Sequence, residues 1–374
     1  MKKLVPICLL LVVFIIQPSA AQFSDARSGG ESLQIIPQPL DPDVKMAFLE
    51  RRRRANVLVD ENYRIWDRSV IQWEDGLYHA YYSRWLGNHK RWLTNSESVH
   101  AVSENPEGPF EDVSVVLSNR NEQGWDIVDV HSQFAVMAEG KLLLYYQSCD
   151  LRGKFPEYPG SPYPSQSWLD NRDNWDLIRN TQRLGLAIAE HPNGPFVRVA
   201  SPVAVPEDCE RCSNITDNPT VVYQDGQYLM IMKSDDARKG KYHQIQFVGR
   251  AKRPDGPFQF NNQPVYAEKR TEDASMWYDQ RAKCYYMVCH VLGQRALAMF
   301  TSVDGMDWQR ASQPVLMKKE FTLTNGEIWK PERLEQPRVL TDRSGRPVML
   351  YVAVADKGVN GNIAVPLITT DAKQ

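Results

Sequence analysis

The chain has 374 residues, of which 42% are hydrophobic and 24% are charged, and its formal net charge is −2 at pH 7. This composition is typical of a globular protein, and the near-neutral charge gives no attraction to nucleic acid or to an anionic membrane. Aromatic residues reach 10%, with 10 Trp and 16 Tyr. Such rings stack well on sugars, which weakly favours a carbohydrate-binding function.

The first 21 residues have the pattern of a secretory signal peptide. Two lysines precede an apolar run from Leu4 to Ile16, and small residues follow at positions 19–21. No other stretch approaches the ~20 apolar residues of a membrane-spanning helix. We therefore expect cleavage after Ala21, a secreted or periplasmic protein without membrane insertion, and an N-terminal extension over residues 22–57.

Five of the six cysteines follow this segment, and two of them form the C-x-x-C pair Cys209 and Cys212. A zinc site would need a second pair or histidines at ligand spacing, and the sequence offers neither. A local disulfide is the better interpretation, because an exported protein meets an oxidising compartment.

From residue 58 onward, one pattern recurs, in which an acidic residue or Ser precedes Gly and an apolar, aromatic strand follows. Its copies begin at Asp75-Gly76, Glu139-Gly140, Asp225-Gly226 and Ser344-Gly345, and a degenerate copy without Gly spans Ala282–His290. Glycine accepts the positive φ of a tight turn, so the pattern predicts five β-hairpins.

A second turn pattern, Pro-x-Gly-Pro-Phe, follows most of these hairpins. It occurs in Ser103–Phe110, Ala189–Phe196 and Ala251–Phe258, with a looser version in Thr301–Trp308. Two hairpins per repeat make a four-stranded antiparallel blade. We therefore predict an all-β, five-bladed β-propeller over residues 58–374, because a β-sandwich would not repeat two turn signatures in the same order.

The repeats place the blades at about Tyr63–Ser118, Trp125–Pro206, Ser213–Ala267, Thr271–Lys318 and Leu334 to the C-terminus. Blade two carries an insertion, Lys154–Arg183, that is rich in aromatic residues and proline. Long loops inside compact domains are usually functional. The insertion either walls a substrate cleft or simply packs over the blade.

The inner strands of a propeller line its central channel, so the residues that enter these strands are the candidates for a site. Counting nine positions back from each turn glycine gives Asp67, His131, Asp217 and Gln336. Glu335 adjoins the last of these, and the fourth blade offers Glu272-Asp273. We expect these groups to converge at one mouth of the channel; turn-forming acidic side chains are the alternative.

Converging carboxyl groups suit glycoside hydrolysis. One carboxyl must stay protonated to donate to the leaving oxygen, and another must be ionised to activate water. Crowded like charges raise one pKa and so divide these roles. We expect the catalytic groups to be Asp67, Asp217, Glu272 and Glu335.

The segment Trp66–Ile71, the strand end Tyr81–Ser83 and the repeated Pro-x-Gly-Pro-Phe turns resemble glycoside hydrolase family 43. Asp217-Asn218-Pro219 is similar to the Glu-x-Pro that carries the general acid in that family. The resemblance implies that Asp67 is the general base and that an acidic residue of a later blade is the acid. His131 stands where the family has an acid-tuning aspartate, so the acid remains open among Asp217, Glu272 and Glu335.

Other residues near the strand ends are candidates for substrate binding: Trp66, Trp85, His131, Asp273, Gln336 and Arg338. Trp66 and Trp85 would stack on a sugar and Arg338 would clamp a hydroxyl or a carboxylate, unless all three serve ordinary blade packing. Asp273 orients a neighbouring carboxyl or binds a hydroxyl. His131 holds a central cation or water, or is a satisfied hydrogen-bonding histidine.

These expectations combine into a secreted, monomeric glycoside hydrolase that acts on plant or algal oligosaccharides or polysaccharides, by inversion and without a cofactor, although a structural cation in the channel stays open. A glycoside phosphorylase is one alternative, and its phosphate pocket would have to use Arg68 or Arg338. A carbohydrate-binding propeller without catalytic activity is the other. Neither a nucleic acid nor a membrane is an expected partner.

Overall fold

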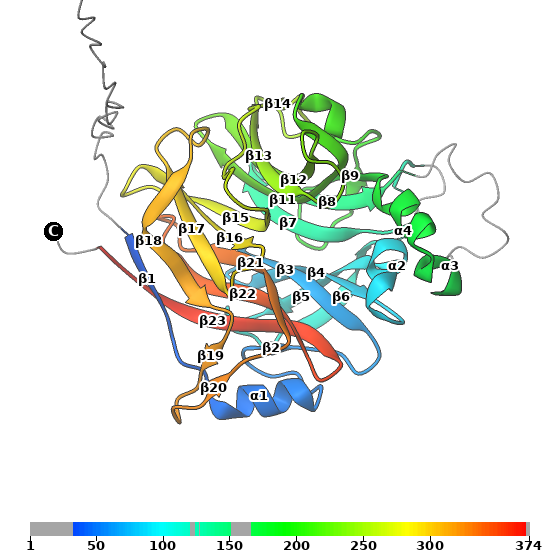
Figure 1. Ribbon diagram of the computed structural model, residues 1–374. Coiled ribbons are helices and arrows are strands. Elements are labelled where there is room, and N and C mark those ends of the chain that lie inside the picture. Colours follow the sequence, from blue (N-terminus) through cyan, green and yellow to red (C-terminus); the bar gives the residue numbers. More distant parts are fainter. Residues whose placement is uncertain (1–32, 120–123, 127, 151–165, 372–374) are drawn as a thin grey trace, which may run out of the picture.

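The computed structural model describes residues 33–119, 124–126, 128–150 and 166–371 and shows five antiparallel sheets arranged around a central axis (Figure 1). The prediction of an all-β, five-bladed propeller is confirmed. The expected signal peptide lies outside the described residues. Within the described part of the chain, no helix is long and apolar enough to cross a membrane.

Blades one to four each contain four strands, and the first strand of each lies at the axis. Blade one consists of β3 (Arg64–Gln72), β4 (Tyr78–Trp85), β5 (Glu97–Ser103) and β6 (Glu111–Leu117). Blade two consists of β7 (His131–Ala138), β8 (Lys141–Cys149), β9 (Gln182–Ala189) and β10 (Val197–Arg198). Blade three consists of β11 (Cys212–Gln224), β12 (Gln227–Asp236), β13 (Gln244–Ala251) and β14 (Gln259–Phe260). Blade four consists of β15 (Thr271–Asp279), β16 (Cys284–Val291), β17 (Ala296–Ser302) and β18 (Gln309–Lys318).

Blade five joins the two ends of the described chain. Its inner strands are β21 (Arg333–Thr341), β22 (Pro347–Asp356) and β23 (Val359–Asp371), and its outer strand is β1 (Leu33–Pro37). Leu33 pairs with Asp371 in this antiparallel contact. Part of the segment 22–57, expected to precede the propeller, therefore completes its last blade and closes the ring.

Short elements cover the edges of the propeller. Near blade five lie α1 (Pro42–Leu49), β2 (Val57–Leu58), β19 (Phe321–Thr322) and β20 (Ile328–Trp329). In the loops of blades one to three lie η1 (His89–Arg91), α2 (Trp92–Asn95), α3 (Gln166–Asp170), α4 (Arg172–Arg179) and η2 (Pro206–Asp208). Figure 1 shows that α2 and α4 lie side by side at one end of the blades, and Trp92 of α2 contacts Trp175 of α4.

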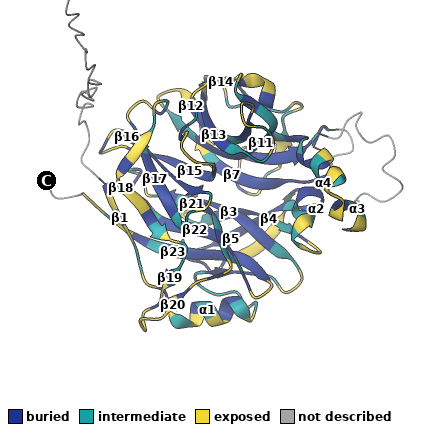
Figure 2. Cartoon of the chain, viewed as in Figure 1, coloured by how far each residue is buried: buried dark blue, intermediate teal, exposed yellow. Residues whose placement is uncertain are grey.

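The hydrophobic core is divided among the five interfaces between neighbouring blades. One large cluster of buried apolar residues fills each interface, as Leu143 of blade two and Phe247 of blade three do together. Figure 2 shows the inner strands as almost wholly buried. Because each blade contributes to two clusters, the position of every inner strand is set from both sides.

The Pro-x-Gly-Pro-Phe turns of blades one, two and three each bind their blade to the one before it. Three tyrosine hydroxyls donate to the first proline carbonyl of the neighbouring turn: Tyr81 to Pro192, Tyr145 to Pro254 and Tyr351 to Pro106, each at 2.7 Å. Blades three and four are followed by blades without this turn. In these two blades the residue that stands in register with the tyrosine is Ile231 or Val288. The turn and the tyrosine therefore occur together as one inter-blade contact.

The C-x-x-C cysteines differ from the expected disulfide. Cys209 and Cys212 are free thiols, buried in the apolar cluster between blades two and three. Apolar side chains surround both residues, and each buried thiol packs among them as a small apolar group.

Candidate active site

Each inner strand contains the same β-bulge close to its first residues. The bulge centres on one residue with positive φ, and these residues are Asp67 (57°), Ser132 (53°), Asn218 (48°), Asp273 (62°) and Gln336 (49°). Such φ values are uncommon outside glycine, and Asn and Asp tolerate them best. A bulge re-aims side chains at the point where it interrupts the ladder, so each blade presents two consecutive side chains to the axis.

The positions of the bulges show that the alignment made from the sequence is wrong by one residue in blades two and three. Counting back from the turn glycine matched Asp67 with His131 and Asp217, whereas the structure matches Asp67 with Ser132 and Asn218. The reason is loop length, because the first hairpin turns through residues 73–77 in blade one but only through 139–140 in blade two and 225–226 in blade three.

The bulges surround a pocket of about 120 Å³ at one mouth of the channel. Eight of the predicted residues line it: Trp66, Trp85, His131, Asp217, Glu272, Asp273, Glu335 and Gln336. The other two, Asp67 and Arg338, do not line the pocket and are buried. The expected convergence of acidic groups from separate blades at one mouth is therefore present in the structure.

Six lining residues were missed by the sequence analysis. Ser132 and Asn218 were lost to the one-residue misalignment, and the others are His89, Trp92, Lys233 and Arg333. Lys233 stands at the end of the apolar strand β12 and pairs with Asp217 across the hairpin. A charged residue within such an apolar strand is a signal that sequence reasoning can use. His89, Trp92 and Arg333 have no comparable signal, because they reach the pocket from loops or from outside the counted register.

Three of the pocket carboxylates have cationic partners. Lys233 Nζ lies 3.0 Å from Asp217 Oδ2 and 3.4 Å from Glu272 Oε2, and Arg333 Nη2 lies 2.6 Å from Glu335 Oε2. Burial opposes the ionisation of Glu272, but Lys233 and His290 outweigh it and lower its pKa to about 2. Glu272 is therefore a stable carboxylate at neutral pH.

Asp273 is the exception in this group. It is buried, and within the described residues no Lys or Arg lies within ion-pair distance of its carboxyl group. Burial raises the pKa of Asp273 well above its usual value, and the neighbouring charges of Glu272, Glu335 and Asp67 raise it further against the opposing effect of Lys233. Asp273 is therefore the pocket carboxyl whose surroundings most favour the protonated form.

Asp67 is wholly buried and reaches the pocket through His131 and Ser132. Its Oδ2 accepts a hydrogen bond from Ser132 N at 3.0 Å and lies 2.9 Å from His131 Nε2. Burial disfavours the charge, but His131 and Arg338 outweigh it, so the pKa of Asp67 lies below its usual value. The ion pair fixes the ring of His131 in the pocket wall.

Arg338 occupies the channel beneath the pocket. Its Nη1 donates to Ala274 O at 2.7 Å, and its guanidinium lies over the ring of Phe134, 5.3 Å from the centroid. Its Nε and Nη2 have no protein partner. In this position Arg338 stabilises the charge of Asp67 from below.

Aromatic rings form the opposite wall of the pocket. Trp85 and Trp92 both contact the ring of His131, at centroid distances of 5.6 and 4.7 Å. Trp175, from helix α4 of the blade-two insertion, contacts Trp92 edge-on at 6.0 Å. The described part of the insertion therefore packs behind the wall of the pocket, whereas its residues 154–165 lie outside the described residues.

Two groups of atoms have the chemistry to hold a cation. Ligand atoms of Glu272, Asp273 and His290 lie within 4.8 Å of one another. Lys319 Nζ, however, lies 2.8 Å from His290 Nε2, and Lys233 borders Glu272, so ammonium groups already supply positive charge there.

The second group lies on the axis, where buried side-chain oxygens without a protein partner come from Asp67, Asn218 and Gln336. Hard cations prefer such oxygen ligands, and water would satisfy them equally. A channel cation therefore remains a proposal.

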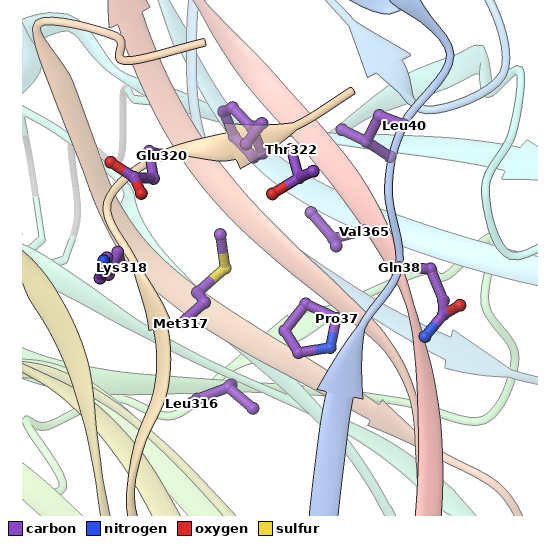
Figure 3. Close-up of a pocket in the computed structure, with 10 residues that line it drawn as sticks. Pro37, Gln38, Leu40, Leu316, Met317, Lys318, Glu320, Thr322 and Val365 are labelled. Carbon is purple, nitrogen blue, oxygen red and sulfur yellow. The ribbon is translucent and has the colours of Figure 1, made fainter. Parts of the chain in front are cut away.

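Two other hollows lack this combination of groups. One of about 740 Å³ lies at the opposite ends of the inner strands, and its acidic residues Glu74, Glu139 and Asp342 are exposed. The other, of about 230 Å³, lies between β1, β18 and β19, and Figure 3 shows apolar side chains such as Met317 and Val365 around it. The pocket at the bulges is the one with several buried carboxyl groups.

Comparison with known proteins gives matches in structure alone. No family model and no curated protein sequence matches the chain. A family 117 glycoside hydrolase from the marine bacterium Zobellia galactanivorans matches with a TM-score of 0.60 and 16% identity, covering 92% of this chain and 93% of its own. The GH43_1 enzyme from Xanthomonas citri matches with a TM-score of 0.56 and 15% identity, covering 87% and 93%.

An endo-arabinase from Bacteroides thetaiotaomicron matches with a TM-score of 0.52 and 11% identity, covering 86% of this chain and 100% of its own. At such low identities the matches establish the fold. The resemblance to family 43 is thus confirmed at the level of the five-bladed propeller shared with glycoside hydrolases.

Proposed function

We propose that the protein hydrolyses glycosidic bonds of oligosaccharides in the pocket at the bulges. The observation that carries the proposal is the unequal pairing of its carboxyl groups, since the buried carboxyl of Asp273 has no Lys or Arg partner among the described residues while three neighbouring carboxylates each have one. Glycoside hydrolysis needs this division. The fold match adds support, because the neighbours with known activities hydrolyse glycosides.

Asp273 is the proton donor in this proposal. Its protonated carboxyl transfers a proton to the glycosidic oxygen as the bond from that oxygen to the anomeric carbon breaks. The resemblance to family 43 suggested Asp217 for this role, but the Asp217 carboxylate forms an ion pair with Lys233 at 3.0 Å. The cation beside Glu272 argues against that residue in the same way.

The water-activating base is Glu272 or Glu335. Both side chains remain partly accessible, at 20% and 17%, whereas that of Asp217 is only 4% exposed. The ionised carboxylate accepts a proton from water as the water attacks the anomeric carbon. Inversion is part of the proposal and requires that water fit between acid and base, at a carboxyl separation of about 6.5–9.5 Å.

Asp67 acts as a positioning residue rather than as the base in this scheme. Its carboxylate is enclosed and contacts His131, which lines the pocket. The contact fixes the imidazole in the pocket wall, and its other nitrogen, Nδ1, lies 3.1 Å from Ser96 Oγ, so the ring borders the sugar without a free donor. Trp66 and Trp85 line the pocket but are only 4% and 1% exposed, so they shape the space for a sugar ring rather than offer an open face for stacking.

Phosphorolysis fits the pocket less well. A phosphate needs uncommitted cations, and the two lining cations, Lys233 and Arg333, already pair with carboxylates. Arg68 is buried between the rings of Phe110 and Tyr351, at the interface of blades one and five. Arg338 is closed off beneath the floor of the pocket.

The test is the release of reducing ends from a broad panel of plant and algal oligosaccharides. We expect the wild type to cleave a member of the panel and Asp273→Asn to lose about 10²–10⁴-fold in kcat. Comparing Glu272→Gln with Glu335→Gln identifies the base. Absence of turnover by the wild type, with glycan binding retained, would make the protein a binding module.

Export and a monomeric state belong to the same proposal. The N-terminal pattern of residues 1–21 supports export, because it has a basic start, an apolar run and small residues at its end. Mass spectrometry of the protein recovered from a secreting host will show whether its first residue is Gln22, and light scattering will give its mass in solution.

A further inference from the structure

The pocket is closed on the side where blade five meets blade one. Arg333 of β21 extends from blade five, and its Nη1 lies 2.5 Å from Nε2 of His89, which belongs to η1 of blade one. The same guanidinium lies 5.4 Å from the ring centroid of Trp66. The two side chains therefore bridge the blades beside the indole that lines the pocket.

The side between blades one and two is closed by aromatic packing. Trp92 of α2 lies between Trp175 of α4 and His131 of β7, with ring centroids 6.0 and 4.7 Å away. Leu93 beside it is buried with Leu169 and Ile178 of the insertion. An extended chain of sugars has no path across this wall.

The floor is closed as well. Asp67 is wholly buried and Arg338 is 2% exposed, and the guanidinium of Arg338 rests on Phe134. The remaining volume of about 120 Å³ is well below the ~300–1,000 Å³ of pockets that enclose a drug-sized ligand. That space suits one sugar ring and excludes two.

We infer that the pocket is blind and accepts a single sugar residue at the end of a chain, so that the protein acts from chain ends and releases monosaccharides. This inference rests on the proposed hydrolase function and deepens it. A sugar residue inside an oligosaccharide would need openings on two sides of the pocket for the rest of the sugar chain. The His89–Arg333 bridge and the Trp92 wall block two neighbouring sides.

The charges of the lining define the sugar further. Among the lining residues that the structure describes, Lys233 pairs with Asp217 and Glu272, and Arg333 pairs with Glu335. Three carboxylates thus face two committed cations, and His89 adds no charge because burial and Arg333 lower its pKa to about 4. The terminal residue is therefore a neutral sugar, since a uronate or a sulfated sugar would find no lining Lys or Arg among the described residues without a carboxylate partner.

The first test follows products over time. Neutral oligosaccharides of increasing length, and matched oligosaccharides that end in a uronic acid, are incubated with the wild type and separated by size. We expect the monosaccharide and a chain shortened by one residue from the earliest time point, with the uronate-capped chains cleaved at least tenfold more slowly. Early products of several lengths, or equal cleavage of capped chains, would overturn the inference.

A binding test works even if no chain is cleaved, so failure of the inference and failure of the proposed function can be told apart. Quenching of tryptophan fluorescence by neutral monosaccharides is compared with quenching by their uronic acids. We expect the neutral sugars to bind at least tenfold more tightly, and Trp85→Phe to abolish the change. Trp73→Phe is the matched control, because Trp73 lines the hollow at the opposite mouth. Equal binding of the acids, no binding of any neutral sugar, or loss in the control overturns the inference.

Opening one wall provides a further check. His89→Ala removes the bridge to Arg333, and we expect affinity for longer chains to rise severalfold relative to monosaccharides. His191→Ala, an exposed histidine in a blade-two turn, should leave this ratio unchanged. An unchanged ratio in His89→Ala would show that the bridge does not limit access.

Discussion

The ammonium group of Lys233 lies 3.4 Å from the carboxylate of Glu272, although the two residues belong to neighbouring blades. Lys233 comes from β12 of blade three and also contacts Asp217 on its own blade at 3.0 Å. One nearly buried cation therefore pairs with two carboxylates across a blade interface. The charge of Glu272, in turn, raises the pKa of Asp273.

Replacing Lys233 with Met should be strongly destabilising. The variant leaves Asp217 and Glu272 without their cation in a site where the lysine side chain is only 11% exposed. Breaking a buried ion pair by removing one partner typically costs about 3–5 kcal/mol. Urea denaturation at pH 7 measures this loss, and protonation of the two acids should recover part of it at lower pH.

The matched control is Lys141→Met. Lys141 pairs with Glu190 at 3.1 Å, but both side chains are exposed, at 48% and 68%. Exposed pairs contribute about 0–1 kcal/mol. Equal losses of stability in the two variants would show that Lys233 does not stabilise the pocket carboxylates.

Asp273→Asn should change how the free energy of unfolding depends on pH. The pKa of Asp273 is raised in the folded protein, so its contribution to stability is full below the unfolded pKa of about 3.9 and is lost as pH rises through the folded pKa. The asparagine variant lacks this loss. We expect its free energy of unfolding, relative to the wild type, to increase as the pH is raised from 4 to 8.

The same variant separates a catalytic role from a structural one. If Asp273 donates the proton, kcat should fall while the folded protein remains at least as stable at pH 8. Asp225→Asn, in an exposed hairpin turn, is the control and should change neither quantity. A variant with full activity would remove Asp273 from the proposed chemistry.

The sequence predicted the fold because the turn chemistry repeats. Turn glycines such as Gly76 and Gly226 adopt positive φ, at 84° and 72°, where a side chain would be strained. These local signals fix the hairpins, and the hairpins determine the blades. The outer strand of blade five escaped prediction because Leu33–Pro37 pairs with residues more than 300 positions away and carries no turn signature.

The candidate site was predicted in outline but misaligned in detail. Acidic residues near the start of each inner strand can be read from the sequence, and most of them line the pocket. The one-residue slip at Ser132 and Asn218 arose from the length of the hairpin turns. The ion pairs that distinguish the pocket carboxyl groups from one another include contacts between blades, such as that of Lys233 with Glu272. No local sequence pattern encodes such contacts.

Tyr81→Phe tests the contact between blades one and two. The variant removes the hydroxyl that donates to Pro192 O at 2.7 Å and leaves that carbonyl without its partner. An unsatisfied buried acceptor costs about 1–3 kcal/mol. Thermal and chemical denaturation should both show a loss in this range.

The comparison variant is Tyr223→Phe, whose hydroxyl donates to Glu139 at 3.1 Å in an exposed position. Surface substitutions of this kind usually change stability by less than about 0.5 kcal/mol. If Tyr81→Phe changed stability as little as Tyr223→Phe, the repeated turns would stabilise their own blades but not the contact between blades.

A buried histidine pair should make the fold sensitive to mild acid. His79 Nδ1 lies 2.9 Å from His100 Nε2, and the ring of His100 stacks on Tyr81 with centroids 5.1 Å apart. Burial and the neighbouring His79 lower the pKa of His100 to about 4, against about 6.5 in the unfolded chain. The folded state therefore resists a proton that the unfolded state accepts, so stability is full above pH 6.5 and is lost as pH falls toward 4.

His100→Phe preserves the stacking on Tyr81 and removes the titration. We expect the variant to lose less stability than the wild type between pH 7 and pH 5, with a difference of up to about 1.4 kcal/mol for each pH unit. Urea denaturation series at these pH values measure both slopes. The control is His191→Ala, which removes an exposed histidine from a blade-two turn and should follow the wild type. Parallel slopes for wild type and His100→Phe would show that His100 takes up its proton without unfolding the blade interface.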